Sequence, residues 1–217
     1  MSLAVATPAS SRSKTRIHFR VWLGLLLWTT GIAYALLVMW EYEMTPGEQT
    51  TAPANWPVQT GITFDHSRPN LLLFAHPRCP CTRATLEELS KLVTQCQDGV
   101  AVEVWFYVPE NSTRDWLQTD LWESAMAIPG VEVQADINGV EAKRFHARTS
   151  GSAVLYDSNG SLLFQGGITA SRGHVGDNSG RSAIQELILT GQSEKSDSFV
   201  YGCPINNGND KFEVNAN

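Results

Sequence analysis

The sequence lacks any concentrated basic surface, and this absence narrows the range of partners. It carries 16 Lys and Arg against 22 Asp and Glu, a formal net charge of −6 over 217 residues. It also lacks the interleaving of arginine and aromatic residues that is typical of nucleic-acid binding. No internal repeat is present, which argues against a repeat architecture. The sequence therefore predicts no nucleic-acid partner.

Charge is missing altogether from residues 21–40, which form an uninterrupted run of apolar and uncharged residues. A run of this length can cross a bilayer as a helix. Trp22 and Trp40 lie near its two ends, where amphipathic rings prefer the membrane interface. We expect residues 21–40 to be a transmembrane anchor.

The two flanks of this run differ in charge, and the difference predicts an orientation. Glu41 and Glu43 follow the run, whereas every charged residue before it is basic: Arg12, Lys14, Arg16 and Arg20. Because basic flanks stay in the cytoplasm, residues 1–20 are predicted to be cytoplasmic, with the soluble domain facing the periplasm from the inner membrane. A cleaved signal peptide is the alternative. The run is longer than a typical signal core, and no small-residue cleavage site is obvious after it.

Two of the four cysteines lie at a corner between an apolar strand and a helix. Residues 71–75 predict the strand, and a helix with apolar residues at helical spacing follows Thr82. Cys79 and Cys81, separated by one proline, lie between the two elements. Unpaired backbone N–H groups and the positive end of the helix dipole favour an anion at such a corner. This stabilises a thiolate, the form that attacks disulfides and binds metals.

An inert structural disulfide, or two unpaired core thiols, is the other interpretation of Cys79 and Cys81. A disulfide between them closes a very small loop and removes little entropy from the unfolded chain. So small a ring is also strained and easily reduced. These two arguments favour redox chemistry or metal binding.

The rest of the chain predicts alternating strands and helices. Residues 41–57 contain prolines and polar residues and predict a tether, and residues 58–64 predict an edge strand. Further strands are expected at 71–75, 100–108 and 131–137, with a hairpin of 152–156 and 161–165. Helices are expected at 82–97, from Ser112 or Thr113 to 126, at 140–147 and at 181–191. Residues 192–217 form a polar tail with one apolar segment around Cys203.

This order of elements resembles the thioredoxin-like superfamily over roughly residues 58–191, and Cys79-Pro80-Cys81 looks like a shortened version of its Cys-Xaa-Xaa-Cys site. Taken with the anchor, the segments His76–Thr82 and Gly173–Asn178 resemble the membrane-anchored bacterial RedB-like group. The resemblance implies an α/β fold, a thioredoxin-like three-layer sandwich with a central mixed β-sheet. One N-terminal transmembrane helix would precede it.

The resemblance also implies roles for residues distant in sequence. Cys79 corresponds to the nucleophile, supported by His76 and Arg78, and Gly151 stands where thioredoxins place a cis-proline. In this superfamily the loop after the hairpin lies beside the cysteine turn. That placement brings several residues within reach of the turn: Ser171, Arg172, His174, Asp177 and Asn178. For Asp177 or Asn178, a cap on the final helix is the other interpretation.

The two remaining cysteines carry different expectations. Cys96 lies about 20 Å or more along the helix from Cys81, so a buried core thiol is expected. Cys203 either docks beside the cysteine turn, where it resolves a mixed disulfide or completes a metal site, or docks elsewhere and pairs with Cys96. His76 is placed to lower a cysteine pKa or to bind metal. The other histidines outside the glycine-rich loop are expected to be solvated: His18, His66 and His146.

The sequence therefore predicts a thiol-disulfide oxidoreductase or isomerase that acts on extracytoplasmic protein thiols or disulfides without a cofactor. The small ring favours donating a disulfide or isomerising over strong reduction. The alternative is a copper metallochaperone using Cys79, Cys81 and His174, because soft thiolates suit Cu(I). A peroxidase is disfavoured because the peroxiredoxin pattern Pro-Xaa3-Thr/Ser-Xaa2-Cys is absent.

Overall fold

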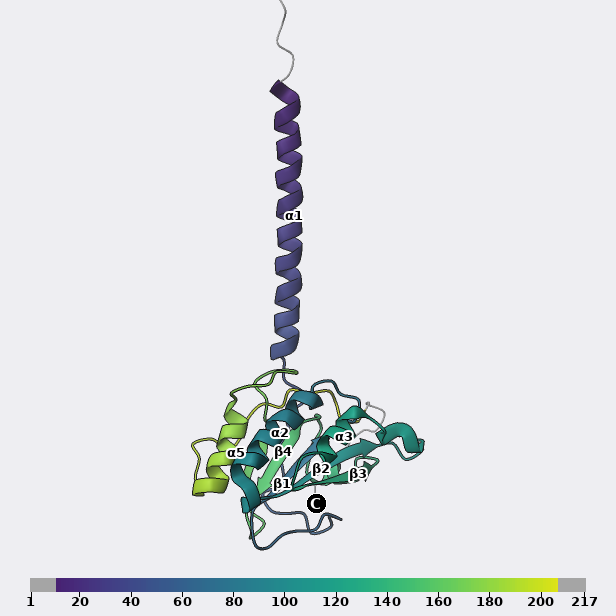
Figure 1. Cartoon of the computed structure of the whole chain (residues 1–217), viewed down its shortest axis with the longest axis vertical. Helices are drawn as coiled ribbons and strands as arrows, with labels where there is room; N and C mark the ends of the chain where they lie inside the picture. The colour runs from purple at the N-terminus through teal and green to yellow at the C-terminus, as the bar shows by residue number, and fades with distance from the viewer. Residues whose placement is uncertain (1–10, 207–217) are drawn as a thin grey trace, which may run out of the picture. The chain divides into compact units, whose positions relative to one another are not determined.

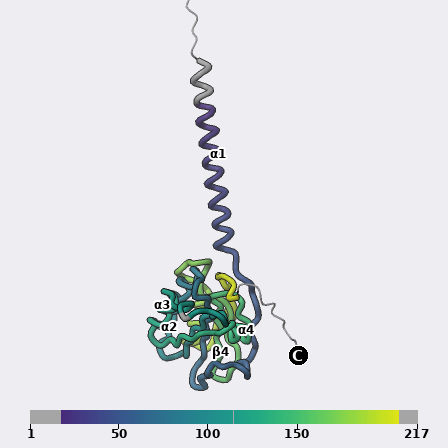
Figure 2. The backbone as a smooth tube through the Cα atoms, turned by 90° about the vertical axis from the view of Figure 1, so that its right-hand side faces the viewer, coloured from purple at the N-terminus to yellow at the C-terminus, as the bar shows by residue number. Residues whose placement is uncertain are grey.

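The computed structural model of the chain describes residues 11–206 and divides into two units, residues 1–42 and 43–217. The described part of the first unit lies in helix α1, Ser11–Met44 (Figures 1 and 2). Its segment His18–Met44 is long and apolar enough to cross a membrane, with a mean hydropathy of 1.9 in its most apolar window. The helix extends beyond both ends of the predicted span of residues 21–40.

The second unit is built on a five-stranded mixed sheet of order β3-β2-β1-β4-β5. The strands are β1 Asn70–Ala75, β2 Ala101–Val108, β3 Val131–Ile137, β4 Ser152–Tyr156 and β5 Leu162–Gly166. Strands β1, β2 and β3 run parallel, whereas β4 is antiparallel to both β1 and β5. The helices are α2 Thr82–Cys96, α3 Asp120–Met126, α4 Val140–Arg144 and α5 Ser179–Thr190, with short 3-10 turns at Gln97–Gly99 and Arg114–Leu117.

Each face of the sheet has its own apolar core, because successive side chains of a strand point to opposite faces. Leu71 and Leu73 of β1 pack under α2, α3 and α5, which cover one face (Figure 1). Leu72 and Phe74 point to the other face, where they pack with Phe145. The arrangement is the three-layer α/β sandwich with a mixed sheet that the sequence predicts.

The segment predicted to be a tether lies on the domain instead. The Trp56 amide donates to the Gly160 carbonyl at 2.8 Å, and Asn55 forms an antiparallel bridge with Ser161 beside β5. The Trp56 ring packs edge-on against Tyr156 at 5.3 Å between centroids. This aromatic packing covers a sheet face on which the only α-helix of the described chain is the short α4. Residues 58–64, predicted as an edge strand, are irregular.

The helix predicted from Ser112 or Thr113 is interrupted. A 3-10 turn at Arg114–Leu117 comes first, and α3 begins only after Thr119, whose hydroxyl accepts from the Trp122 amide at 3.2 Å. The side-chain cap lies at Thr119, whereas the Thr113 side chain makes no cap hydrogen bond, so the α-helix begins later than the sequence pattern predicts.

Candidate active site: three cysteines at the start of helix α2

The cysteine turn follows β1 directly and is held by its own backbone. The Cys79 amide donates to the His76 carbonyl at 3.1 Å, and the Thr82 amide donates to the Cys79 carbonyl at 3.0 Å. Cys81 is the N-cap residue of α2, and its carbonyl accepts from the Thr85 amide at 3.3 Å. Both cysteines therefore lie at the positive end of the helix, where a thiolate is stabilised.

A third cysteine completes the site. The backbone amide of Cys203 donates to Cys79 Sγ at 3.4 Å, and the thiols of Cys81 and Cys203 both act on the pKa of Cys79. Cys79 and Cys81 are 1% and 6% exposed, and Cys203 is half-buried. Of the two places left open for Cys203 by the sequence, the structure shows the one beside the cysteine turn.

The pKa values of the three thiols are shifted in different directions. The hydrogen bond from Cys81, together with those from Cys203, lowers the pKa of Cys79 to about 4 against the opposing effect of burial. The hydrogen bond that Cys81 makes to Cys79, with burial and the Cys79 charge, raises the pKa of Cys81 far above its usual value. Burial, followed by the hydrogen bond to Cys79 and its charge, raises the pKa of Cys203 to about 11. Cys79 is thus the thiolate, and its two neighbours keep their protons.

Residues 202–205 reach this position as an irregular tail segment that pairs through its backbone with the loop before β4. Thr149 and Pro204 form an antiparallel bridge, and the Ser150 amide donates to the Cys203 carbonyl at 2.8 Å. Arg172 donates from Nη1 to the Gly202 carbonyl at 2.7 Å. Arg172, expected near the site, therefore reaches it by contacting the tail segment. Its charge partly opposes the rise in the pKa values of Cys81 and Cys203.

His76 is buried beside the cysteine turn, with 8% of its surface exposed. Its backbone amide donates to Ser150 Oγ at 2.8 Å, and its Nδ1 accepts from the Arg78 amide at 3.1 Å. Because Nδ1 accepts, the proton of the neutral ring lies on Nε2, and that atom is buried without a hydrogen-bond partner. Burial lowers the pKa of His76, and the nearby negative charge of Cys79 opposes this effect.

Arg78 and Gly151 flank the site on opposite sides. The exposed guanidinium of Arg78 lies 3.9 Å from the centroid of the Trp116 ring. Gly151 directly precedes β4, as expected, and its amide donates to the Phe74 carbonyl at 2.8 Å. Its φ of +95° explains the glycine, since other residues rarely adopt such a backbone. No cis peptide bond occurs at Gly151 or elsewhere in residues 11–206.

Three residues predicted from the glycine-rich loop fall outside this cluster: His174, Asp177 and Asn178. His174 is exposed, with Nδ1 2.9 Å from the Arg172 carbonyl oxygen and Nε2 3.9 Å from the Glu43 carboxylate. Asn178 caps α5 by accepting from the Arg181 amide at 2.8 Å, and Asp177 lies 3.6 Å from the Arg181 guanidinium. The capping interpretation is therefore correct for Asn178.

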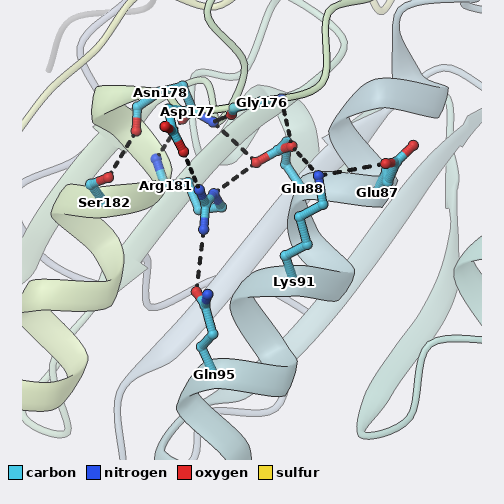
Figure 3. A network of polar contacts seen from close by, with 9 residues as sticks. All are labelled: Glu87, Glu88, Lys91, Gln95, Gly176, Asp177, Asn178, Arg181 and Ser182. Carbon is cyan, nitrogen blue, oxygen red and sulfur yellow. Dashed lines mark hydrogen bonds and ion pairs between the residues drawn. The ribbon is translucent and has the colours of Figure 1, made fainter.

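The same loop is fastened to α2 by buried charges (Figure 3). The Glu88 side chain is fully buried and lies 2.7 Å from Arg181 Nε and 2.9 Å from Lys91 Nζ. It also accepts from the Gly176 amide at 2.9 Å and from Asn178 Nδ2 at 3.2 Å. This network fixes the loop that carries Arg172, although it touches none of the sulfurs directly.

The other predictions for cysteine and histidine are met where the structure describes them. Cys96 is 5% exposed within the apolar core, and burial raises its pKa. His66 and His146 are exposed, as is His18 on α1. Within residues 11–206, no group of three or more His, Cys, Asp or Glu side chains is arranged to hold a metal ion.

Two residues of the site escaped the sequence analysis. Ser150 links the turn to the tail segment, since its hydroxyl also lies 2.9 Å from Thr82 Oγ1. Trp116 lies within the helix predicted from Ser112 or Thr113, but it contacts Arg78, and its ring lies edge-on to His76 at 6.0 Å. A signal for Trp116 was available, because residues six apart, such as Trp116 and Trp122, do not share one helical face.

The strand order, the mixed sheet and the cysteine turn before α2 define a thioredoxin-like fold. A hypothetical protein from Sinorhizobium meliloti 1021 shares it with a TM-score of 0.58 at 18% identity, over 74% of this chain and 97% of its own. An uncharacterized conserved protein from Geobacillus kaustophilus gives a TM-score of 0.54 at 16% identity, over 75% of this chain and 92% of its own.

A secreted disulfide oxidoreductase of Mycobacterium tuberculosis also matches, with a TM-score of 0.41 at 14% identity, over 58% of this chain and 82% of its own. At such identities these likenesses concern the fold alone. No protein-family model and no curated protein matches the chain.

Proposed function

We propose that the protein is a thiol-disulfide oxidoreductase or isomerase in which Cys79 is the nucleophile and Cys81 its exchange partner. One observation carries this proposal: at the start of α2, Cys79 Sγ accepts the Cys203 amide at 3.4 Å, and the neighbouring thiols of Cys81 and Cys203 add to the lowering of its pKa. These donors stabilise a thiolate, and the thiolate is the form that attacks disulfides.

The asymmetry between the thiols fits the order of steps. The Cys79 thiolate attacks one sulfur of a substrate disulfide, and the broken bond leaves the other substrate sulfur as a thiolate. In this mixed disulfide Cys79 no longer carries a negative charge. The hydrogen bond to the Cys79 thiolate and the Cys79 charge, which both raise the pKa of Cys81, are therefore lost. Cys81 then loses its proton more easily and attacks Cys79 Sγ. The Cys79–Cys81 disulfide forms as the second substrate thiol departs.

Helix α1 supports a membrane-anchored location for this chemistry. Its segment His18–Met44 meets the length and composition needed to span a bilayer. The basic residues before it and the acidic residues after it favour a domain in the periplasm, tethered to the inner membrane. An oxidising compartment of this kind makes disulfide exchange productive. Together with the Cys-Pro-Cys turn, the anchor supports placing the chain near the RedB-like group.

The test is turnover by the full chain in detergent, with insulin disulfides and scrambled ribonuclease as separate substrates. We expect Cys79→Ser to lower the rate by about 100-fold or more, because the attacking sulfur is lost. Cys96→Ala is the matched control and should retain the wild-type rate within about twofold, since this thiol lies in the core.

Undiminished turnover in Cys79→Ser would contradict the proposal. A Cu(I) titration of the same samples separates it from the copper carrier. Stoichiometric and tight copper binding without any turnover would favour the carrier instead.

A further inference from the structure

The strongest nucleophile of the site is also its most covered sulfur. Cys79 has the lowest pKa of the three clustered cysteines but exposes only 1% of its surface. The tail segment Tyr201–Asn206 lies over it, with the Cys203 amide directed at its sulfur. A protein substrate therefore cannot reach Cys79 while this segment is in place.

The tail segment is paired as a peptide would be paired on a sheet edge. Its Cys203 carbonyl accepts from the Ser150 amide, and its Ile205 amide donates to the Arg148 carbonyl, both at 2.8 Å. Main-chain pairing of this kind binds an extended peptide largely without regard to its sequence. The loop 148–150 is thus a peptide-docking edge that delivers one residue, here Cys203, to Cys79 Sγ.

The tail segment packs closely against the domain. Val200 and Ile205 are buried at 6% and 3% exposure, on either side of half-buried Cys203. At Gly202 any Cβ would overlap the Ser150 carbonyl oxygen, so only glycine allows the close approach. The chain is built to hold a cysteine against Cys79.

We propose that Tyr201–Asn206 is a built-in substrate strand and that Cys203 is a third redox thiol, which takes over the disulfide first formed between Cys79 and Cys81. This inference rests on the proposed function, which supplies that first disulfide. The resulting Cys79–Cys203 bond is the resting oxidised form of the protein, and it closes the docking edge to other polypeptides.

The step conserves atoms and electrons. Cys203 gives up its proton, and its thiolate attacks Cys79 Sγ within the Cys79–Cys81 disulfide. The Cys203–Cys79 bond forms as the Cys79–Cys81 bond breaks, and the electron pair of the broken bond goes to Cys81 Sγ, which takes up a proton. One disulfide and one thiol are present before and after, so no oxidant is needed.

Ring strain favours this direction. The Cys79–Cys81 disulfide spans a single proline, and so small a ring is strained and easily opened by exchange. Residues 79 and 203 are 124 apart in sequence and are already held together by the fold, so their disulfide closes no such small ring. Cys203 is also relieved of the neighbouring charge that raises its pKa once Cys79 is bonded.

The first experiment maps the disulfide in the oxidised full chain. The protein is oxidised with glutathione disulfide, blocked with iodoacetamide, cleaved with trypsin and analysed by mass spectrometry without reduction. We expect peptide Cys79–Arg83 to be linked to peptide Ser196–Lys211 in most molecules. The same link should persist in Cys81→Ser and disappear in Cys79→Ser. Alkylated Cys203 beside an internal Cys79–Cys81 bond in the wild type would overturn the proposal.

The second experiment displaces the strand without removing its thiol. Gly202→Val forces the segment off the Ser150 carbonyl, so the Cys79–Cys81 bond should predominate although Cys203 is present. Insulin turnover should rise by about tenfold because the docking edge is open in a larger fraction of molecules. Phe199→Ala is the matched control, since its side chain is exposed. A retained cross-link with unchanged turnover in Gly202→Val would contradict the built-in strand.

The two proposals fail in different ways. If insulin turnover survives Cys79→Ser, the oxidoreductase itself is wrong. If turnover requires Cys79 but Cys203→Ser leaves both the disulfide map and the rate unchanged, only the built-in strand is wrong. Neither of these serine variants changes the backbone pairing of the tail segment.

Discussion

Helix α2 carries a cysteine at each end, and the two ends have opposite chemistry. Cys81 is the N-cap residue of the helix, where the neighbouring Cys79 thiolate raises the pKa of its thiol. Cys96, the last residue of α2, is buried among apolar side chains, and the only cause of its raised pKa is that burial. Similar exposure therefore says little about reactivity. The partners of a sulfur, and the end of the helix dipole it meets, decide what it does.

Glu88, between these two cysteines, adds a third kind of environment. Its side chain is as buried as that of Cys96, yet it contacts Arg181 of α5, Lys91 of α2 and the Gly176 amide of the glycine-rich loop (Figure 3). The surroundings of α2 therefore change along its length. Thiols surround its N-terminus, charged groups surround Glu88 in its middle, and apolar side chains surround Cys96 at its C-terminus.

The largest expected effect concerns the N-terminal end. Removing both exchange partners in Cys81→Ala/Cys203→Ala leaves the Cys79 thiolate unable to release a bound substrate. We expect a stable mixed disulfide with insulin on non-reducing gels, and turnover lowered by about 100-fold or more. Cys96→Ala should form no such adduct beyond the wild-type level. An adduct that forms equally in Cys96→Ala would remove the distinction between the two ends.

The same comparison extends to the pH dependence of stability in the fully reduced protein. The pKa of Cys79 is lowered from its ordinary value near 9 to about 4, so between these values the folded state binds fewer protons than the unfolded state. Stability from Cys79 must therefore grow as pH rises through this window and be lost as pH falls toward 4.

Urea unfolding of wild type and Cys79→Ala at several pH values measures this contribution. The difference in unfolding free energy should increase from pH 5 to pH 8. Cys96→Ala should show a difference independent of pH there, because its thiol stays protonated in both states. A flat difference for Cys79→Ala would show that its charge is not stabilised by the fold.

In the middle of α2, removing the buried Glu88 carboxylate leaves the Arg181 side chain, which is 11% exposed, without its nearest carboxylate. We expect Glu88→Ala to lower the free energy of unfolding by about 3 kcal/mol or more, as for other broken buried pairs. Glu87→Ala, one residue away, removes an exposed carboxylate 3.5 Å from Lys91 and should change stability little. Equal effects of the two substitutions in urea unfolding would contradict the clamp shown in Figure 3.

The smallest effect is expected from a half-buried carboxylate outside α2. Burial raises the pKa of Glu103 on β2 to about 7, with the charge of Glu132 adding to the shift and the Trp105 indole opposing it. The folded state therefore retains a proton that the unfolded state loses, and stability declines as pH rises through 7. Glu103→Gln should weaken this decline between pH 5 and pH 8. An unchanged pH profile would show that Glu103 is not the group responsible.

The sequence predicted the elements whose pattern is local. Strand β3 lies at the predicted residues 131–137, and the corner holding Cys79 and Cys81 follows from an apolar run, a proline and a helical repeat. The position of Gly151 just before β4 also follows from local counting. These features depend on periods of two and about 3.6 residues that a single segment reveals.

The parts that were not predicted depend on pairing between distant segments. Residues 41–57 have the composition of a tether, but Trp56 finds Phe145 and Tyr156 only in the folded domain. Cys203 and Ser150 meet through backbone hydrogen bonds, which leave no mark in side-chain composition. The site was therefore half visible: the cysteine turn was evident, but the sequence could not choose between the two placements of Cys203.

The bridge between Asn55 and Ser161 has a further consequence for self-association. Together with the parallel bridge between Gln165 and Asp197, it occupies the outer rim of β5. Bare rims of sheets recruit strands from other molecules and nucleate aggregates. At the opposite rim, β3 presents exposed Glu132 and Gln134. One rim sheltered by the chain itself and one made hydrophilic would let neighbouring copies crowd together without polymerising.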